Sequence, residues 1–194
     1  IFIKAELGDM EGALVLLAEL ERSDPDRARG AAWMVASSWE ARDAALAHLH
    51  ALGSRGGAYS PRTFACVETV LRELPQRQAR RARGLPSVCD DAPGERRLQL
   101  MAREGDLDGA YAEASTAFAG PSSGDVGVLF FPTLKAFRAD PRFMPLTKRL
   151  GLLDYWSRSG KWPDFCSEPD LPYDCRQSAG RLAASPSPTP PGSS

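Results

Sequence analysis

The chain has 194 residues, enough for one domain or one continuous array with a substantial core. Its 24 Lys and Arg residues nearly balance 25 Asp and Glu residues, so no charge excess indicates a nucleic-acid groove or an anionic membrane surface. No run of 18 apolar residues occurs, which predicts no membrane span. Because the start lacks both Met and a signal-peptide pattern, we expect the C-terminal portion of a longer protein, with its compartment, cytoplasmic or periplasmic, left open.

A six-residue pattern near the start returns near residue 105. Residues 8–13 read Gly-Asp-Met-Glu-Gly-Ala and residues 105–110 read Gly-Asp-Leu-Asp-Gly-Ala, an offset of 97 residues. That offset is close to three periods of about 34 residues, the length of a tetratricopeptide (TPR) unit. The first copy leads into an apolar stripe at Leu14, Leu17, Ala18 and Leu20, which predicts a helix.

The two copies resemble TPR units, which carry small residues where paired helices approach closely and a Pro where the second helix ends. The matching positions are Gly8, Ala13 and Pro25 in the first copy and Gly105, Ala110 and Ala117 in the second, where Pro121 comes one residue early. The resemblance implies an all-α superhelix of roughly three to four helical hairpins over residues 1–175.

The resemblance also implies that about fourteen residues precede the turn in a complete unit. Only seven precede Gly8, so we expect the chain to open inside a first helix. Its apolar edge, at Ile1, Phe2, Ile3 and Leu7, is then one that an earlier repeat would cover.

The middle of the chain departs from the pattern. Residues 39–45, followed by Leu46, Leu49 and Leu52, resemble a degenerate copy. A second stripe over residues 64–74 predicts a helix that ends at Pro75, and residues 84–94 are expected to form a loop. The basic run Arg77, Arg80, Arg81 and Arg83 is interpreted as a solvated helix, with phosphate contact as the less favoured reading.

The C-terminal part begins with a short strand-like run at residues 126–131, and a helix is expected to start near Pro132. Asp140 and Pro141 suit the start of a helix whose apolar face carries Phe143, Leu146, Leu150 and Leu153, interrupted at Gly151. Residues 140–166 resemble the closing segment of bacterial TPR proteins. The resemblance implies a capping helix and strap at about 140–175 that seal the last hairpin.

Trp162 and Phe165 are expected to fold back over the end of the array. Tyr155, Trp156 and Trp162 fit either an aromatic binding box or core packing, and core packing is favoured. Cys166 and Cys175 flank a Pro-rich loop and form a possible disulfide; two cytosolic thiols are the alternative. Residues 176–194, rich in Pro and Ser, are predicted to be a disordered tail.

No pattern in the chain indicates catalysis, a cofactor or a metal. The cysteines at 66, 89, 166 and 175 form no Cys-x-x-Cys pair, and His48 and His50 fall on opposite sides of a predicted helix. Neither a Gly-x-Ser-x-Gly nucleophile pattern nor a phosphate-binding Gly-rich loop occurs.

We therefore expect a non-enzymatic scaffold that binds a protein or peptide in a concave groove. The resemblance implies the regulatory arm of a larger bacterial signalling or transcription-regulating protein, joined to an upstream winged-helix or nucleotide cyclase domain. This part of the protein is not expected to bind nucleic acid directly. A small-molecule sensor is the alternative, and a hydrolase on helical hairpins is less favoured.

Overall fold

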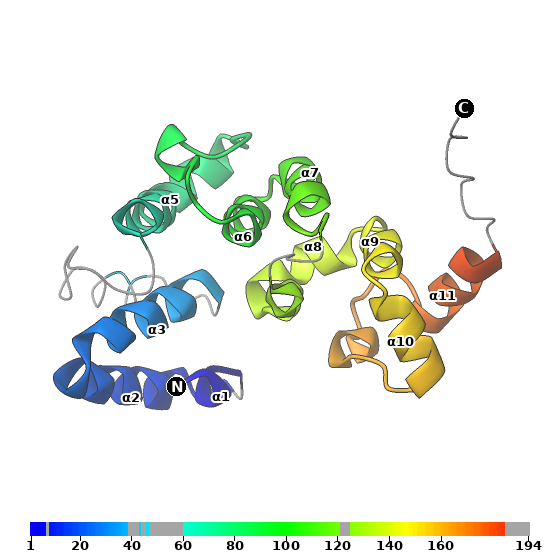
Figure 1. The fold of residues 1–194 in the computed structure, drawn as a ribbon, viewed down its shortest axis with the longest axis horizontal. Helices are drawn as coiled ribbons and strands as arrows, with labels where there is room; N and C mark the ends of the chain where they lie inside the picture. Colours follow the sequence, from blue (N-terminus) through cyan, green and yellow to red (C-terminus); the bar gives the residue numbers. More distant parts are fainter. Residues whose placement is uncertain (7, 39–42, 44–45, 47–59, 121–124, 185–194) are drawn as a thin grey trace. The chain divides into compact units, whose positions relative to one another are not determined.

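The computed structural model describes residues 1–6, 8–38, 43, 46, 60–120 and 125–184 (Figure 1). Within these residues all regular secondary structure is helical and no strand occurs, which confirms the predicted all-α class. The chain forms two compact units, Ile1–Ala136 and Phe137–Ser194, which are described separately below.

The N-terminal unit consists of α-helices joined by short 3-10 turns. Its helices are α1 (Phe2–Glu6), α2 (Met10–Ser23), α3 (Pro25–Ser38), α5 (Pro61–Ala79), α6 (Gly94–Glu104) and α7 (Leu107–Ala117), and its 3-10 turns are η1 (Ser87–Cys89), η2 (Val126–Phe130) and η3 (Pro132–Leu134). Helices α2 and α3 pack against each other as one pair, and α6 and α7 pack as another. The predicted degenerate copy at residues 39–52 lies outside the described residues, apart from Asp43 and Leu46.

Small and β-branched residues fill the main core of this unit. Ala28, Ala32 and Val35 of α3 are fully buried in one cluster with side chains of α5 and with Leu17 of α2. Of the small residues in the repeat pattern, Ala13 and Ala110 are fully buried. The cluster also contains Leu100, so α6 belongs to the same core.

Helix α5 does not end at Pro75, which corrects the prediction. It begins at Pro61 and runs through Pro75 to Ala79, and the hydroxyl of its N-cap, Ser60, accepts a hydrogen bond from the Thr63 amide at 3.2 Å. Proline removes a backbone donor and costs stability inside a helix. Contacts beyond Pro75 offset that cost, because Arg77 binds Glu104 and the Gln78 amide nitrogen donates to the Arg103 carbonyl at 2.8 Å.

The strand-like run at residues 126–131 is also a correction, because it forms the 3-10 turn η2. Asp125 starts this turn by accepting a hydrogen bond from the Gly127 amide at 2.8 Å. A side chain that bonds its own backbone two residues on favours a turn over a strand. Helix α8 (Lys135–Ala139) follows η3, so the helix expected near Pro132 is present.

The C-terminal unit contains α9 (Phe143–Arg149), α10 (Leu152–Ser159), the 3-10 turn η4 (Asp164–Ser167) and α11 (Cys175–Ala184). The single helix predicted over residues 140–153 is two helices, because Gly151 adopts a left-handed conformation with φ of +74° between α9 and α10. The predicted start at Asp140 and Pro141 is also corrected, because α9 begins at Phe143 with Arg142 as its N-cap; the Asp140 carboxylate accepts a hydrogen bond from the Arg142 amide at 2.9 Å before the helix.

The predicted disordered tail differs from the structure over its first part, because residues 176–184 belong to α11. Asp174 caps this helix by accepting a hydrogen bond from the Gln177 amide at 2.7 Å. Ser178 and Ala179 are buried on its inner face, and Lys148 of α9 donates to the Leu182 carbonyl. The rest of the predicted disordered tail, residues 185–194, lies outside the described residues.

Candidate functional site

The repeated hexapeptide forms the same turn twice. Gly8 and Gly105 have φ of +79° and +89°, and the aspartates after them have φ of −81° in both copies, with ψ of 68° and 71°. Each glycine amide donates to an alanine carbonyl at 3.1 Å, from Gly8 to Ala5 and from Gly105 to Ala102. A left-handed glycine of this kind closes one helix before the next begins.

Each turn starts its second helix with an aspartate cap. The Asp9 carboxylate accepts a hydrogen bond from the Gly12 amide at 2.9 Å, and the Asp106 carboxylate accepts one from the Gly109 amide at 3.2 Å. A methyl group at Gly12 or Gly109 would collide with the capping carboxylate, which explains the second glycine of the pattern. The two halves of the N-terminal unit therefore share a folded turn as well as a sequence pattern.

The aspartate of the second turn makes additional hydrogen bonds to the chain that follows α5, which the aspartate of the first turn does not make. Asp106 is 3 % exposed, and its carboxylate also accepts hydrogen bonds from the Gly84 amide and the Arg83 guanidinium, both at 2.8 Å. Burial would raise the pKa of Asp106, but the hydrogen bonds from Gly84, Arg83 and Gly109 outweigh it and hold the pKa below its ordinary value. Arg83 also reaches Asp108 at 3.0 Å.

A buried ion pair lies beside this turn. The Glu104 carboxylate is completely buried and binds Arg77, whose guanidinium also donates to the Gly84 carbonyl. Burial raises the pKa of Glu104, and the nearby Arg77 opposes that rise without cancelling it. Arg77 and Arg83 both bind carboxylates of the α6–α7 turn; the interpretation of the run as solvated is wrong at Arg77, whose side chain is largely buried, whereas the Arg83 side chain remains 68 % exposed.

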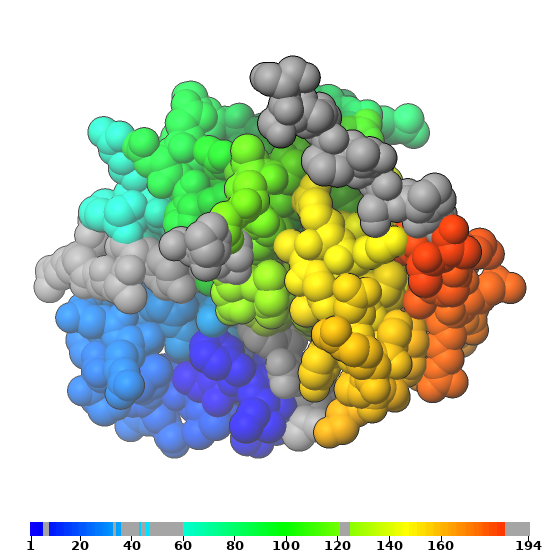
Figure 2. Space-filling view, turned by 45° about the vertical axis from the view of Figure 1, so that its right-hand side comes forward, coloured from blue at the N-terminus to red at the C-terminus, as the bar shows by residue number. Residues whose placement is uncertain are grey.

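An apolar groove opens on the first half of the N-terminal unit. It has a volume of about 660 Å³ and is lined by Ile1, Phe2, Leu20, Asp26, Arg27, Gly30, Ala31 and Met34. These residues come from the start of the chain and from α2 and α3, and only Asp26 and Arg27 are charged. In the space-filling view the first residues, in dark blue, lie at the surface beside the lighter blue of α2 and α3 (Figure 2).

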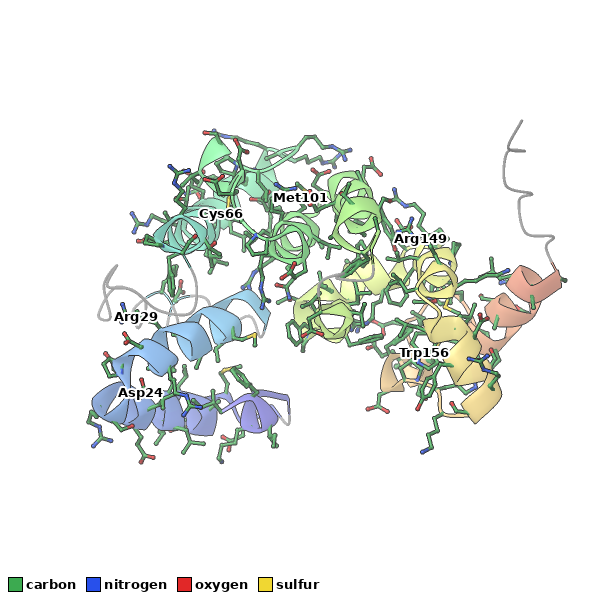
Figure 3. All side chains as sticks on the ribbon, viewed as in Figure 1. Asp24, Arg29, Cys66, Met101, Arg149 and Trp156 are labelled. Atoms are coloured by element: carbon green, nitrogen blue, oxygen red, sulfur yellow. A yellow bond between two sulfur atoms is a disulfide. The ribbon has the colours of Figure 1, made fainter. Side chains whose placement is uncertain are left out.

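The aromatic residues of the strap pack within the C-terminal unit. Trp156 is buried, with its ring centroid 6.3 Å from that of Trp162 and 6.1 Å from that of Phe165 (Figure 3). Phe165 continues the stack to Phe143, centroid to centroid 5.4 Å. Tyr155 is 55 % exposed whereas Trp156 is buried, so core packing describes Trp156 but not Tyr155.

All four cysteines are paired in the structure. Cys166 and Cys175 form a disulfide with an S–S distance of 2.08 Å, closing the Pro-rich loop between them. Cys66 of α5 and Cys89 of η1 form a second disulfide at 2.06 Å (Figure 3). This second pair was not predicted, because Cys66 and Cys89 are 23 residues apart and no sequence spacing links them.

No group of three or more possible metal ligands gathers among the described residues. His48 and His50 lie outside those residues. In the described part of the chain, none of the helices combines the length and the apolar character that a bilayer crossing requires.

Comparison with known proteins adds no relative: no family model, curated protein or solved structure matches this chain.

Proposed function

We propose that this chain is a non-catalytic scaffold of TPR-like helical hairpins that binds an apolar segment of a peptide or protein. The observation that carries the proposal is the repeated Gly-Asp turn, formed with the same backbone angles at Gly8-Asp9 and Gly105-Asp106. Two copies of one helix–turn–helix connection are what an array of repeated hairpins requires. Such arrays commonly present grooves to extended or helical partners.

The groove beside α2 and α3 is the surface that fits such a partner. Its lining is apolar apart from the neighbouring pair Asp26 and Arg27, which have opposite charges and lie on the first turn of α3. An apolar floor supplies affinity through removal of area from water, and charged residues beside it orient the bound segment. We therefore propose a peptide with two or three apolar side chains, flanked by at least one charged residue.

A selected peptide tests this function. Peptides chosen from a displayed 12-residue library on the full chain are measured by isothermal titration calorimetry against the wild type and two lysine variants. Phe2→Lys places a charge in the groove lining and is expected to weaken binding at least tenfold. Val15→Lys is the matched control, because Val15 of α2 is 54 % exposed and does not line the groove. Equal weakening by both variants, or by neither, contradicts the groove.

A small-molecule sensor is the second candidate, and the size of the groove favours it. Pockets for small ligands commonly have volumes of about 300–1,000 Å³. The groove falls within that range at about 660 Å³. A fragment library followed by thermal shift distinguishes the two candidates. A fragment that raises the melting temperature of the wild type but not of Phe2→Lys, with no peptide selected, supports the sensor.

The resemblance of the closing segment to bacterial multidomain regulators extends the proposal to a role as the regulatory arm of a larger protein. The reading frame upstream of Ile1 tests this extension. A winged-helix or nucleotide cyclase domain there supports it, and an unrelated enzyme domain contradicts it.

A further inference from the structure

The two Gly-Asp turns allow the first hairpin to be compared with the second, residue by residue. At the offset of 97 residues, Ile3 of α1 corresponds to Leu100 of α6, Asp9 to Asp106 and Glu11 to Asp108. The corresponding residues differ in burial, because Leu100 is 1 % exposed whereas Ile3 is 74 % exposed. An isoleucine so exposed at the position of a core leucine is the difference to be explained.

In the second copy, the covering element can be identified. Leu100 belongs to the same buried cluster as Val70 and Leu71 of α5, and α5 packs on α6. The chain leaving α5 then reaches the turn, where the Gly84 amide and the Arg83 guanidinium bind the Asp106 carboxylate. One continuous element, an amphipathic helix followed by an Arg-Gly step, thus packs in the same core as Leu100, together with α3, and binds the Asp106 carboxylate.

The first copy has counterparts of two of the three carboxylates on its surface; the third, Glu104, which binds Arg77 in the second copy, corresponds to Leu7. The Asp9 carboxylate has the orientation of the Asp106 carboxylate, because both accept a hydrogen bond from the glycine three residues later. Asp9 is about half exposed, and Glu11 stands where Asp108 binds Arg83 in the second copy. Together, Ile3, Asp9 and Glu11 form a surface, called here the α1 face, with one apolar and two anionic points.

We infer that the α1 face is a docking surface for an amphipathic helix followed, after a short turn, by an Arg-Gly step. The apolar side of the incoming helix covers Ile3. Its glycine amide donates to the Asp9 carboxylate, and its arginine bridges Asp9 and Glu11 as Arg83 bridges Asp106 and Asp108. This surface is separate from the apolar groove, whose lining does not include Ile3, Asp9 or Glu11.

One residue of the first copy occupies part of this site. Lys4 binds the Asp9 carboxylate, whereas the corresponding residue of the second copy is Met101. The Lys4 side chain is 44 % exposed, and an exposed ion pair of this kind contributes little stability. The arriving arginine therefore displaces Lys4 at small cost, and Lys4 acts as a competitor for the carboxylate.

The test uses the segment that the second copy already binds. A synthetic peptide with the sequence of residues 70–86, which contains no cysteine, is titrated into the isotope-labelled full chain and followed by two-dimensional NMR. We expect saturable shifts at Ile3, Gly8, Asp9 and Glu11. Ile3→Lys is expected to weaken binding at least tenfold, and replacing the peptide's arginine at position 83 by alanine about fivefold.

Val15→Lys is the matched control. Val15 is another exposed β-branched residue, at 54 %, and its counterpart Ala112 in the second copy is exposed as well. Binding unchanged by Val15→Lys but weakened by Ile3→Lys supports the docking surface. The inference is overturned if no saturable shift occurs at the α1 face. Shifts confined to Leu100 and Asp106 also overturn it, because the peptide then only replaces its own counterpart. Both outcomes leave the groove unaffected, since Phe2→Lys tests that site separately.

Discussion

Asp9 and Asp106 show how one residue type in one backbone conformation serves two structural roles. Both cap a helix through the amide of a glycine three residues later. Asp9 adds only a pair with Lys4, and hydrogen bonds from Lys4 and Gly12 lower its pKa. Asp106 instead joins the end of α5 to the α6–α7 turn from a buried position. The environment therefore sets how much each carboxylate stabilises the fold.

Replacing each aspartate by alanine measures that difference. Asp9→Ala removes a helix cap and is expected to lower the free energy of unfolding by about 1 kcal/mol. Asp106→Ala also leaves the Gly84 amide and Arg83 without their acceptor, so its expected cost is about 3 kcal/mol. Urea denaturation followed by circular dichroism measures both. Equal costs would show that the α5–α7 junction adds nothing to the cap.

Glu104 makes stability depend on pH in a defined direction. Burial raises its pKa in the folded protein above the ordinary value of 4.5. A carboxyl group of this kind stabilises the fold fully when protonated, below the unfolded-state pKa, and the contribution is lost as the pH rises through the folded-state pKa.

The variant Glu104→Gln stays neutral and lacks that loss. The free energy of unfolding of the wild type minus that of Glu104→Gln is therefore expected to fall as the pH rises from about 4 to 7. Urea titrations at several pH values give the difference directly. A difference that instead grows with pH would mean that the pair with Arg77 outweighs burial.

At the scale of elements, two helix boundaries differ from those that the sequence pattern predicts, one at a proline and one at a glycine. Pro75 lies inside α5 without ending it, because Arg77 and Gln78 are held by partners on and beside α6. Gly151 ends a helix that the apolar spacing predicts to be continuous, because it adopts a positive φ. Neither outcome follows from the local pattern alone. The partners of Arg77 and Arg83 lie 27 and 23 residues along the chain, beyond any helical spacing.

The break at Gly151 is tested by alanine substitution. Gly151→Ala forces a side chain into the left-handed conformation and is expected to lower the free energy of unfolding by about 1–2 kcal/mol. Gly180→Ala is the matched control, because Gly180 lies inside α11 with open space around its added methyl group. That variant is expected to gain about 0.4–1 kcal/mol. A gain at both positions would mean that residues 143–159 tolerate one continuous helix.

For the whole molecule, the sequence was sufficient to predict the helical class, both Gly-Asp turns and the apolar face of the closing segment. A binding groove was expected, but its lining was not predicted, because it brings together Ile1, Leu20 and Met34 from three separate segments. The Cys66–Cys89 pair was missed because the path of the loop after α5 decides it. Features that depend on contacts within one helix or turn were predictable. The groove lining and the Cys66–Cys89 pair depend on contacts between separate segments of the chain, and these were not predicted.

Each unit contains one disulfide, which gives a prediction for the molecule as a whole. The pairs span 23 residues for Cys66–Cys89 and 9 residues for Cys166–Cys175. Chain-entropy estimates give losses of about 3.4 and 2.6 kcal/mol when the respective pairs are replaced by alanine. Non-reducing peptide mapping checks the pairing, and denaturation of the two double variants checks the order. Four free thiols in the protein from its native host would contradict both pairs and the oxidising compartment that they favour.

The tilted contact between Trp156 and Trp162 gives the strap an optical signature. Phe165, which packs on Trp156, precedes Cys166, and Arg176, whose guanidinium lies over the Trp162 ring, follows Cys175. Two indoles held 6.3 Å apart at 46° couple electronically, and the disulfide tethers the neighbours of both. The near-ultraviolet circular dichroism of the tryptophans is therefore expected to fall when Cys166 and Cys175 are replaced by alanine, and much less when Cys66 and Cys89 are replaced. The near-ultraviolet circular dichroism signal of the tryptophans thus reports whether the Cys166–Cys175 disulfide is formed, without any added label.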